Sequence, residues 1–402
     1  MANVYLTYQS AIRELKESRT ESGLAAAHPQ HTTEKSTYAS LFPRDIGICT
    51  YGLIASGDAD LLKLAKQSLT SLIPSQSPRG QFPQNYEPDT KTAHWWMPGT
   101  IDGTLWWSIA ALEYIKATQD TAWHARISSH LDRAFTWLTY QDTDNDSLLE
   151  QGVAAGWDDE MPRHGTVLYT NTLWFRLITL LVEVDDRRRL LPLKNKIHEA
   201  INTLLWVHKS DDRTHAYIPN NSYTQENVYA STMIEWASSQ AVYLPYYLGY
   251  SAHREFEMRC DVFGNILACL FGVATPEKAK QFTEFALRAG IHLPYPVKVL
   301  YPPIYPGEPD WKPYMAKGRQ NYPWQYHNGG IWPFVGGFWV WWLSKYDKAL
   351  AQAQLEQLAE ANDLNNMEFN EYLHGQHGTP MGNPHQSWSA AMFVKAYKEI
   401  FE

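Results

Sequence analysis

Glu371 is the residue of this 402-residue chain best placed by its surroundings for acid–base chemistry. It lies in NNMEFNEYLHGQHGTPMGNPHQSWSA, residues 365–390, where glycines at 375, 378 and 382 and prolines at 380 and 384 rule out a continuous helix. Loops of this kind commonly carry function. The nearby side chains combine hydrogen-bonding groups with flat apolar faces, which suits a sugar: Tyr372, His374, His377, His385, Gln386 and Trp388. A solvated loop with an ordinary surface glutamate is the competing interpretation.

A second acidic group follows Gly156 in the run GWDDE, residues 156–160. Adjacent like charges raise one another's pKa, and the neighbouring indole of Trp157 removes water from them. Asp158 or Asp159 is therefore a candidate for a carboxylic acid that stays protonated near neutral pH, as a general acid must. A solvated acidic turn would have the same sequence.

Three further polar groups stand where apolar helices are expected to begin. Arg44 and Asp45 precede one such helix, either as a clamp for hydroxyl groups or, for Asp45, as a simple helix cap. Asp102 opens a helix whose first turns carry two tryptophans. The third group stands at the start of an apolar helix and consists of Arg259, Asp261 and Asn265.

No metal site or cofactor is expected. Asp142, Asp144 and Asp146 superficially resemble a calcium-binding loop, but the required glycine and terminal glutamate are missing from their positions. The histidines and the three cysteines lack the spacing of a zinc site, and the cysteines do not suggest a disulfide framework.

Composition narrows the function further. The formal net charge of −9, without a compensating cluster of lysine and arginine, argues against a nucleic-acid or anionic-membrane surface. Seventeen tryptophans and 24 tyrosines exceed the needs of a core and suit the stacking of sugars. The N-terminal segment has no signal-peptide core, and no stretch approaches the roughly 18 apolar residues of a membrane span. These features predict a cytoplasmic protein.

The elements that must position these residues are helices. The hydrophobic period is 3.6 throughout, which predicts about twelve helices in alternating pairs, with functional loops between them. No linker divides the chain, so residues 1–402 are expected to form a single domain. Only THAYIPN, residues 214–220, has the pattern of a strand, so folds that alternate strands and helices are excluded.

Several motifs carry a resemblance to a known family. Five motifs resemble those of the neutral and alkaline invertases of glycoside hydrolase family 100, and they follow one another along the chain in the same order. They are FPRD at 42–45, IDGTLWW at 101–107, RCDVFGNILACLFGVATPEKA at 259–279, YHNGGIWP at 326–333, and NEYLHG followed by QSWSAA. GWDDEMPR, residues 156–163, is more similar to the glucosylglycerate, mannosylglycerate and oligosaccharide glucosidases of family 63.

The resemblance implies an all-α fold, the (α/α)6 barrel, and glycoside hydrolysis with inversion at the anomeric carbon. It places the general acid at Asp158, with Asp159 as a one-residue alternative, and the general base at Glu371. Arg44, Asp45, Asp102, His327 and Asn328 match positions that line the sugar pocket. Further candidates for substrate binding, of which Trp332 and Trp388 could equally be core, are Trp157, Arg259, Asp261, Trp332, Gln386 and Trp388.

The expected reaction is hydrolysis of a small α-glucoside, with sucrose favoured. A glucosylglycerate-type or other short α-glucoside is the alternative substrate. An N-acylglucosamine 2-epimerase type of sugar epimerase or isomerase and a non-enzymatic carbohydrate-binding protein are the alternative functions. The loops around Trp95, Trp157 and Trp311 are expected to close over the pocket. The only expected partner is a small carbohydrate, and association into homo-oligomers stays open.

Overall fold

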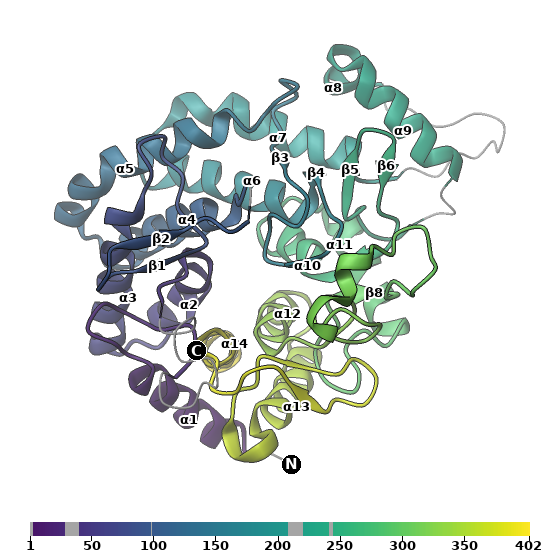
Figure 1. The fold of residues 1–402 in the computed structure, drawn as a ribbon. Helices are drawn as coiled ribbons and strands as arrows, with labels where there is room; N and C mark the ends of the chain where they lie inside the picture. The colour runs from purple at the N-terminus through teal and green to yellow at the C-terminus, as the bar shows by residue number, and fades with distance from the viewer. Residues whose placement is uncertain (1–2, 29–39, 98, 208–219, 241–243) are drawn as a thin grey trace.

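Helices arranged in two concentric rings make up most of the protein (Figure 1). The computed structural model describes residues 3–28, 40–97, 99–207, 220–240 and 244–402. Six inner helices contact one another in succession, and the last packs on the first, which closes the ring. They are α2 (Pro43–Ala55), α4 (Asp102–Thr118), α6 (Leu168–Glu183), α10 (Val262–Leu270), α12 (Pro333–Tyr346) and α14 (Ser387–Phe401).

Six outer helices each pack on the neighbouring inner helix. They are α1 (Val4–Glu17), α3 (Ala59–Leu72), α5 (Thr121–Thr139), α7 (Leu191–Leu204), α11 (Pro276–Arg288) and α13 (Lys348–Met367). The outer helices have one apolar face; in α11, for example, Ala279, Phe282 and Ala286 are buried while Lys280 is exposed. The inner helices are apolar nearly all round, because neighbours cover them on every side. This arrangement confirms the predicted (α/α)6 barrel.

Close packing of the inner ring depends on small residues. A Cβ atom at Gly52 of α2 would lie 2.0 Å from the backbone oxygen of Ala391 in α14. Only glycine allows the two helices to approach so closely, and this contact is the one that closes the ring.

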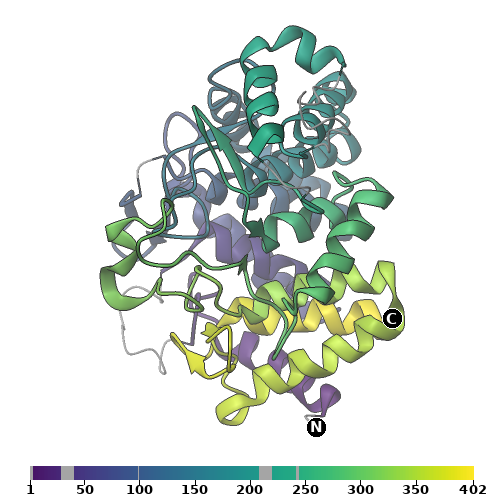
Figure 2. The same ribbon diagram turned by 90° about the vertical axis from the view of Figure 1, so that its right-hand side faces the viewer.

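One end of the barrel carries almost all of the irregular structure. Short turns lead from inner to outer helices, whereas long loops lead from outer helices into the N-terminal ends of the inner helices. Figure 2 shows these loops gathered on one side, opposite the C-terminal end of α14. We call this end the mouth. The residues predicted to act on substrate all lie in these loops or in the first turn of an inner helix.

Short antiparallel strands stiffen the mouth loops. β1 (Asn85–Glu87) pairs with β2 (Thr92–His94), β7 (Cys260–Asp261) with β8 (Leu300–Tyr301), and β9 (Tyr372–Leu373) with β10 (Pro380–Met381). A four-stranded sheet has the order β3 (Glu150–Gln151), β4 (Gly165–Val167), β5 (Tyr250–Ala252) and β6 (Glu255–Phe256). The prediction of one strand was therefore wrong. Strands of two or three residues are too short to show a period of two, and residues 214–219 of the predicted strand lie outside the described residues.

Two helices lie outside the twelve-helix pattern. α8 (Ser222–Glu226) and α9 (Val228–Gln240) pack on α7 at the outside of the barrel. α7 follows the 3-10 turn η2 (Arg188–Leu190). Two further 3-10 segments are η1 (Ile73–Ser75) and η3 (Pro313–Arg319).

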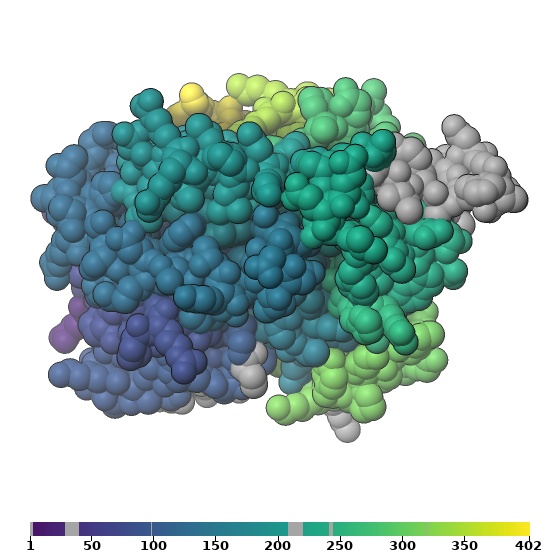
Figure 3. All heavy atoms as spheres, turned by 90° about the horizontal axis from the view of Figure 1, so that it is seen from above, coloured from purple at the N-terminus to yellow at the C-terminus, as the bar shows by residue number. Residues whose placement is uncertain are grey.

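The space-filling view in Figure 3 shows the middle of the chain, blue to green, forming one continuous face. Among the described residues, none of the helices combines the length and the apolar character needed to cross a membrane.

Candidate active site

The first turns of α2, α4 and α6 bring a charged network into the mouth. Nη1 of Arg44 donates to Oδ2 of Asp102 at 3.0 Å, and the hydroxyl of Tyr169 donates to the same oxygen at 3.1 Å. The indole of Trp106 in turn donates to the Tyr169 oxygen at 2.6 Å. Asp45 lies beside the guanidinium, and burial raises its pKa to about 6 although Arg44 opposes the shift. Tyr169, at the first turn of α6, belongs to no motif singled out in the sequence.

The GWDDE segment crosses the mouth above these helices. Arg44 also donates to the carbonyl oxygen of Gly156 at 3.1 Å, which ties the segment to α2. Trp157 is only 2 % exposed and packs edge-on against His327, Trp332 and Phe334. Trp157 therefore forms part of the apolar floor of the mouth and does not form a lid, contrary to expectation.

The other two residues expected to close over the pocket, Trp311 and Trp95, lie in different surroundings. Trp311 packs against a small cluster that includes Met161 and Met315, so it supports the loops from within. Trp95 is exposed, with 42 % of its surface accessible.

Asp158 and Asp159 face opposite sides of the mouth. Asp158 is 3 % exposed and lies 2.9 Å from Nη1 of Arg163. Asp159 faces the Arg44, Asp45 and Asp102 group. Burial raises the pKa of each aspartate to about 7, opposed by Arg163 at Asp158 and by Arg44 at Asp159. Both carboxylic acids thus have the property predicted from the sequence.

Arg163 joins three buried carboxylates, and sequence analysis missed it. Besides Asp158, it contacts Glu257 at 2.9 Å and Asp261 at 3.2 Å. Its side chain is 3 % exposed. Arg163 and Glu257 belong to loops that are distant in sequence, so no local pattern announces the cluster. Asp261, predicted to bind substrate, lies within this cluster.

Glu371 is held at the edge of the β9–β10 hairpin. Its backbone N–H donates to the carbonyl of Asn383 at 3.0 Å, and the Asn383 N–H donates to its Oε2 at 2.9 Å. The side chain is buried, with the residue 6 % exposed. Gly382 has φ +75°, and a Cβ there would lie 2.4 Å from Oε2 of Glu371. The loop glycines that marked this segment in the sequence therefore include one that directly backs the carboxylate.

The two polar residues of the HNGG segment, His327 and Asn328, have different roles. His327 is buried and stacks on Trp332 with ring centroids 4.7 Å apart. Burial holds its pKa well below the usual range, so the imidazole is neutral. The carboxamide of Asn328, in contrast, forms hydrogen bonds with the backbone. Its oxygen accepts the N–H of Ile304, and its nitrogen donates to the carbonyl oxygens of Ile304 and Asn321. Asn328 thus holds the mouth loops together, a role the sequence did not indicate.

Three more residues predicted to contact substrate have partners within the protein. Arg259 forms ion pairs with Glu308, at 2.8 Å, and with Asp310. Trp388 stacks on Phe334 with centroids 4.3 Å apart. Gln386 precedes α14, where its backbone N–H donates to Phe369 at 3.0 Å.

Buried side-chain polar atoms without a hydrogen-bond partner gather at the mouth. Among the described residues, they include Nε1 of Trp157, both ring nitrogens of His327, Nε2 of Gln386 and Nε1 of Trp388. Buried polar groups in proteins normally have a partner, so each such atom calls for an explanation. A ligand rich in hydroxyl groups could satisfy donors and acceptors of this kind together.

A cavity of about 520 Å³ opens beside Asp159, and we call it the mouth cavity. Asp159 and Glu160 contribute to its wall. Trp96, Tyr314 and Tyr326 add aromatic surfaces, and Lys317 adds a positive charge. Its size is in the range of small-molecule sites.

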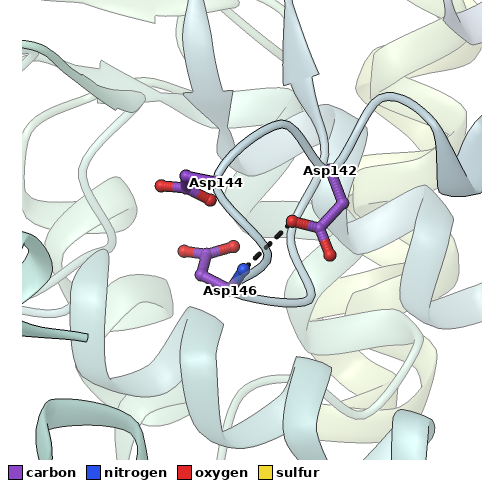
Figure 4. Close-up of side chains that lie close together, drawn as sticks. All are labelled: Asp142, Asp144 and Asp146. Carbon is purple, nitrogen blue, oxygen red and sulfur yellow. Dashed lines mark hydrogen bonds between the residues drawn. The ribbon is translucent and has the colours of Figure 1, made fainter. Parts of the chain in front are cut away.

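The acidic loop at 142–146 lies apart from this cavity. Asp142, Asp144 and Asp146 turn toward one another, with ligand atoms within 4.8 Å (Figure 4). Both oxygens of Asp142 accept backbone N–H groups, from Asp146 and Ser147. Asp146 accepts from the Leu148 N–H and the Tyr223 hydroxyl. The bonds to Asp142 and Asp146 shape the loop itself.

Comparisons with known proteins identify the family of the chain. The profile of the family described as alkaline and neutral invertase matches residues 98–401. Neutral/alkaline invertase 1, mitochondrial, from Oryza sativa subsp. japonica is 24 % identical over 93 % of this chain and 66 % of its own length. Probable alkaline/neutral invertase D from Arabidopsis thaliana is 23 % identical over 93 % of this chain and 77 % of its own.

A solved structure shares the fold. The family 63 mannosylglycerate hydrolase from Thermus thermophilus, in complex with Tris and D-glycerate, superimposes with a TM-score of 0.65 at 14 % identity. The match covers 97 % of this chain and 99 % of that one. The motifs, the barrel and the profile match lead to one assignment: the chain belongs to the alkaline and neutral invertase family of glycoside hydrolases.

Proposed function

We propose that the protein hydrolyses a small α-glucoside with inversion of the anomeric carbon, and that sucrose is its first substrate. One observation carries the proposal: two loops bring carboxylates to the mouth from opposite sides of the barrel. In the ring order α2, α4, α6, α10, α12, α14, the helix α6 lies opposite α14. Asp158 and Asp159 precede α6, and Glu371 precedes α14.

This placement suits an inverting hydrolase. Inversion needs an acid on one face of the glycosidic bond and a base on the other, about 6.5–9.5 Å apart, with a water beside the base. Glu371 takes a proton from the water as its oxygen attacks the anomeric carbon. The acid gives its proton to the leaving oxygen as the glycosidic bond breaks. An α-glucoside therefore yields β-glucose as the first product.

The acid comes from the Asp158–Asp159 pair. The GWD motif supports Asp158, whose raised pKa keeps it protonated near neutral pH. Asp159 is the alternative because it lines the mouth cavity. The two side chains face different partners, so single substitutions separate them.

Arg44, Asp45, Asp102 and His327 form the proposed pocket for the terminal glucose. Arg44 and the carboxylates can bond several hydroxyls of one ring, which favours action at a chain end. Leaving a buried hydroxyl-binding group unpaired costs about 1–3 kcal/mol, so the pocket should discriminate against other sugar epimers. Sucrose is favoured because the family and the two plant relatives are named as invertases. Glucosylglycerate is the second choice.

A substrate panel tests the proposal. Purified protein is mixed with sucrose, glucosylglycerate, trehalose, maltose and starch, and the first sugar released is followed by proton NMR. We expect sucrose to be cleaved fastest and β-glucose to appear first. Preferential cleavage of starch, or initial release of α-glucose, would overturn the proposal.

The compartment of the cell in which the protein acts stays a prediction. The sequence predicts a cytoplasmic protein, whereas the name of the rice relative places that protein in mitochondria.

A further inference from the structure

The mouth cavity lies where the leaving group of the substrate should bind. In the proposed reaction the acid protonates the leaving oxygen, so the leaving group must be next to the acidic pair. Asp159 is part of the cavity wall, and Glu160 follows it in the chain. This step rests on the proposed function.

The cavity wall has two acidic side chains and one basic one. They are Asp159, Glu160 and Lys317. Burial raises the pKa of Asp159 to about 7, so Glu160 is the main carboxylate of the wall near neutral pH. Nζ of Lys317 lies 3.8 Å from Oε1 of Glu160, and the lysine side chain is 80 % exposed, whereas that of Glu160 is 26 % exposed. An anionic leaving group would therefore meet the Glu160 carboxylate, beside a lysine that already faces this carboxylate.

Glu160 is held in an unusual backbone conformation. Its φ is +65°, in the left-handed region that residues with a side chain seldom adopt. Such strain is found where surrounding structure fixes a residue, often at functional sites. The buried Asn321 lies beside this segment, with its carboxamide nitrogen 3.5 Å from the carbonyl oxygen of Asp159.

One oxygen of Glu160 is also available as an acceptor. Oε2 is buried and forms no hydrogen bond of ordinary geometry among the described residues. Burial raises the pKa of the Glu160 carboxyl, and the neighbouring Lys317 and Asn321 oppose this rise. A neutral leaving group with hydroxyls can donate to this oxygen. Trp96 and Tyr314, both in the cavity wall, present flat faces on which a sugar ring can stack.

We propose that Glu160 is a specificity-determining residue that excludes anionic leaving groups from the mouth cavity and admits neutral, hydroxyl-rich ones. It acts in two ways. Its carboxylate repels a second carboxylate, and it occupies the lysine that would otherwise attract one. The Thermus thermophilus structure of the same fold holds D-glycerate, an anion of the kind that this cavity should reject.

The test compares the binding of two leaving groups by calorimetry in the wild type and in Glu160→Gln. The probes are D-glycerate, which is anionic, and D-fructose, which is neutral. We expect the substitution to tighten the binding of D-glycerate by about tenfold or more at low salt, because it removes the repulsion and frees Lys317. Fructose binding should change much less. Rising salt should weaken the gain by screening.

Two further variants serve as controls. Glu235→Gln on α9 makes the same change in net charge away from the cavity wall, and it should leave the binding of D-glycerate unchanged. Adding Lys317→Gln to Glu160→Gln should remove most of the gain. Equal binding of D-glycerate by the wild type and Glu160→Gln would overturn the inference. Failure of the wild type to hydrolyse any α-glucoside would instead overturn the proposed function, and the binding comparison would still decide the role of Glu160.

Discussion

At the scale of single residues, the two proposed catalytic carboxyl groups are controlled by very different neighbours. Glu371 accepts the backbone N–H of Asn383 and packs against Gly382, while Asp158 shares Arg163 with two other carboxylates. One guanidinium cannot neutralise three carboxylates, and burial already disfavours their charge. A protonated Asp158 relieves this excess of negative charge, which suits an acid.

Glu371→Gln and Asp158→Asn should each lower hydrolysis by about 10²–10⁴-fold, the usual contribution of a positioned acid or base. Turnover of the preferred substrate gives the measurement, and circular dichroism checks that each variant is folded. Asp159→Asn is the matched control. Normal turnover in Asp158→Asn combined with loss in Asp159→Asn would move the acid by one residue, and normal turnover in both would reject the pair.

The pH dependence follows from the direction of the shift at Asp158. Burial raises the pKa of Asp158 to about 7, and the acid must be protonated to act. kcat/KM should therefore fall as pH rises through about 7. Arg163 opposes the rise, so Arg163→Gln should move this alkaline limb to higher pH, whereas Arg163→Lys should move it less. A limb that stays in place in both variants would argue against Asp158.

Sequence reasoning found the acidic groups at this scale but not their surroundings. It predicted that Trp157 would desolvate the neighbouring aspartates, and both have raised pKa values because of burial. It could not show that Trp157 faces the floor or that Asn328 bonds backbone groups. Arg163 was missed because two of its three partners, Glu257 and Asp261, come from another part of the chain that only the fold brings close.

At the scale of elements, the β9–β10 hairpin positions Glu371. The hairpin is also tied to α12, since Leu373 and Ile331 exchange two backbone hydrogen bonds of 2.7 and 2.8 Å. The position of Glu371 is therefore fixed relative to Trp332, which follows Ile331 in the chain and forms part of the floor of the mouth. Such precision depends on the close approach of Gly382.

Gly382→Ala should abolish most of the activity, because the added Cβ would lie 2.4 Å from Oε2 of Glu371 and displace the carboxylate. Gly272→Ala is the matched control. Gly272 has φ +79° against +75° for Gly382, but a Cβ there meets nothing within 4 Å. Both variants should lose about 1 kcal/mol of stability from the left-handed backbone. Melting temperatures and kcat separate the two effects; an equal loss of kcat in both would refute the steric explanation.

Helices could be predicted well at this scale, and strands could not. The helical period predicted about twelve helices in alternating pairs, and the six inner and six outer helices of the barrel agree with this number. The strands have two or three residues each, so their pairing depends on which loops the barrel places side by side. α8 and α9 were not distinguished from the twelve paired helices for a similar reason: nothing in a single helical pattern shows whether it belongs to the ring.

At the scale of the whole molecule, the ring of six inner helices brings distant segments into one mouth. α2 and α14 come from opposite ends of the chain, yet they pack together and α1 covers α14. This closure explains why the candidate site draws residues from position 44 to position 388. A single domain over residues 1–402 stays a prediction.

Activity should survive removal of divalent metal ions. Inverting hydrolysis needs only the acid, the base and water, and the Asp142–Asp146 loop lies apart from the mouth cavity. The measurement is turnover after dialysis against EDTA, with magnesium and calcium added back separately. If activity is lost and one ion restores it, that acidic loop becomes a metal site on which the fold or the reaction depends. Unchanged turnover with a lower melting temperature would limit its role to stability.

The shared direction of the inner helices has an electrostatic consequence. Each helix carries roughly half a positive elementary charge at its N-terminal end, from aligned peptide dipoles. All six N-terminal ends face the mouth, so the protein backbone contributes a positive potential there. Such a potential would disfavour the cationic sugar that forms as a glycosidic bond breaks. Ionised carboxylates at the mouth oppose this effect of the backbone dipoles, so a negatively charged Glu371 would favour the positive charge at the anomeric carbon as well as act as the proposed base.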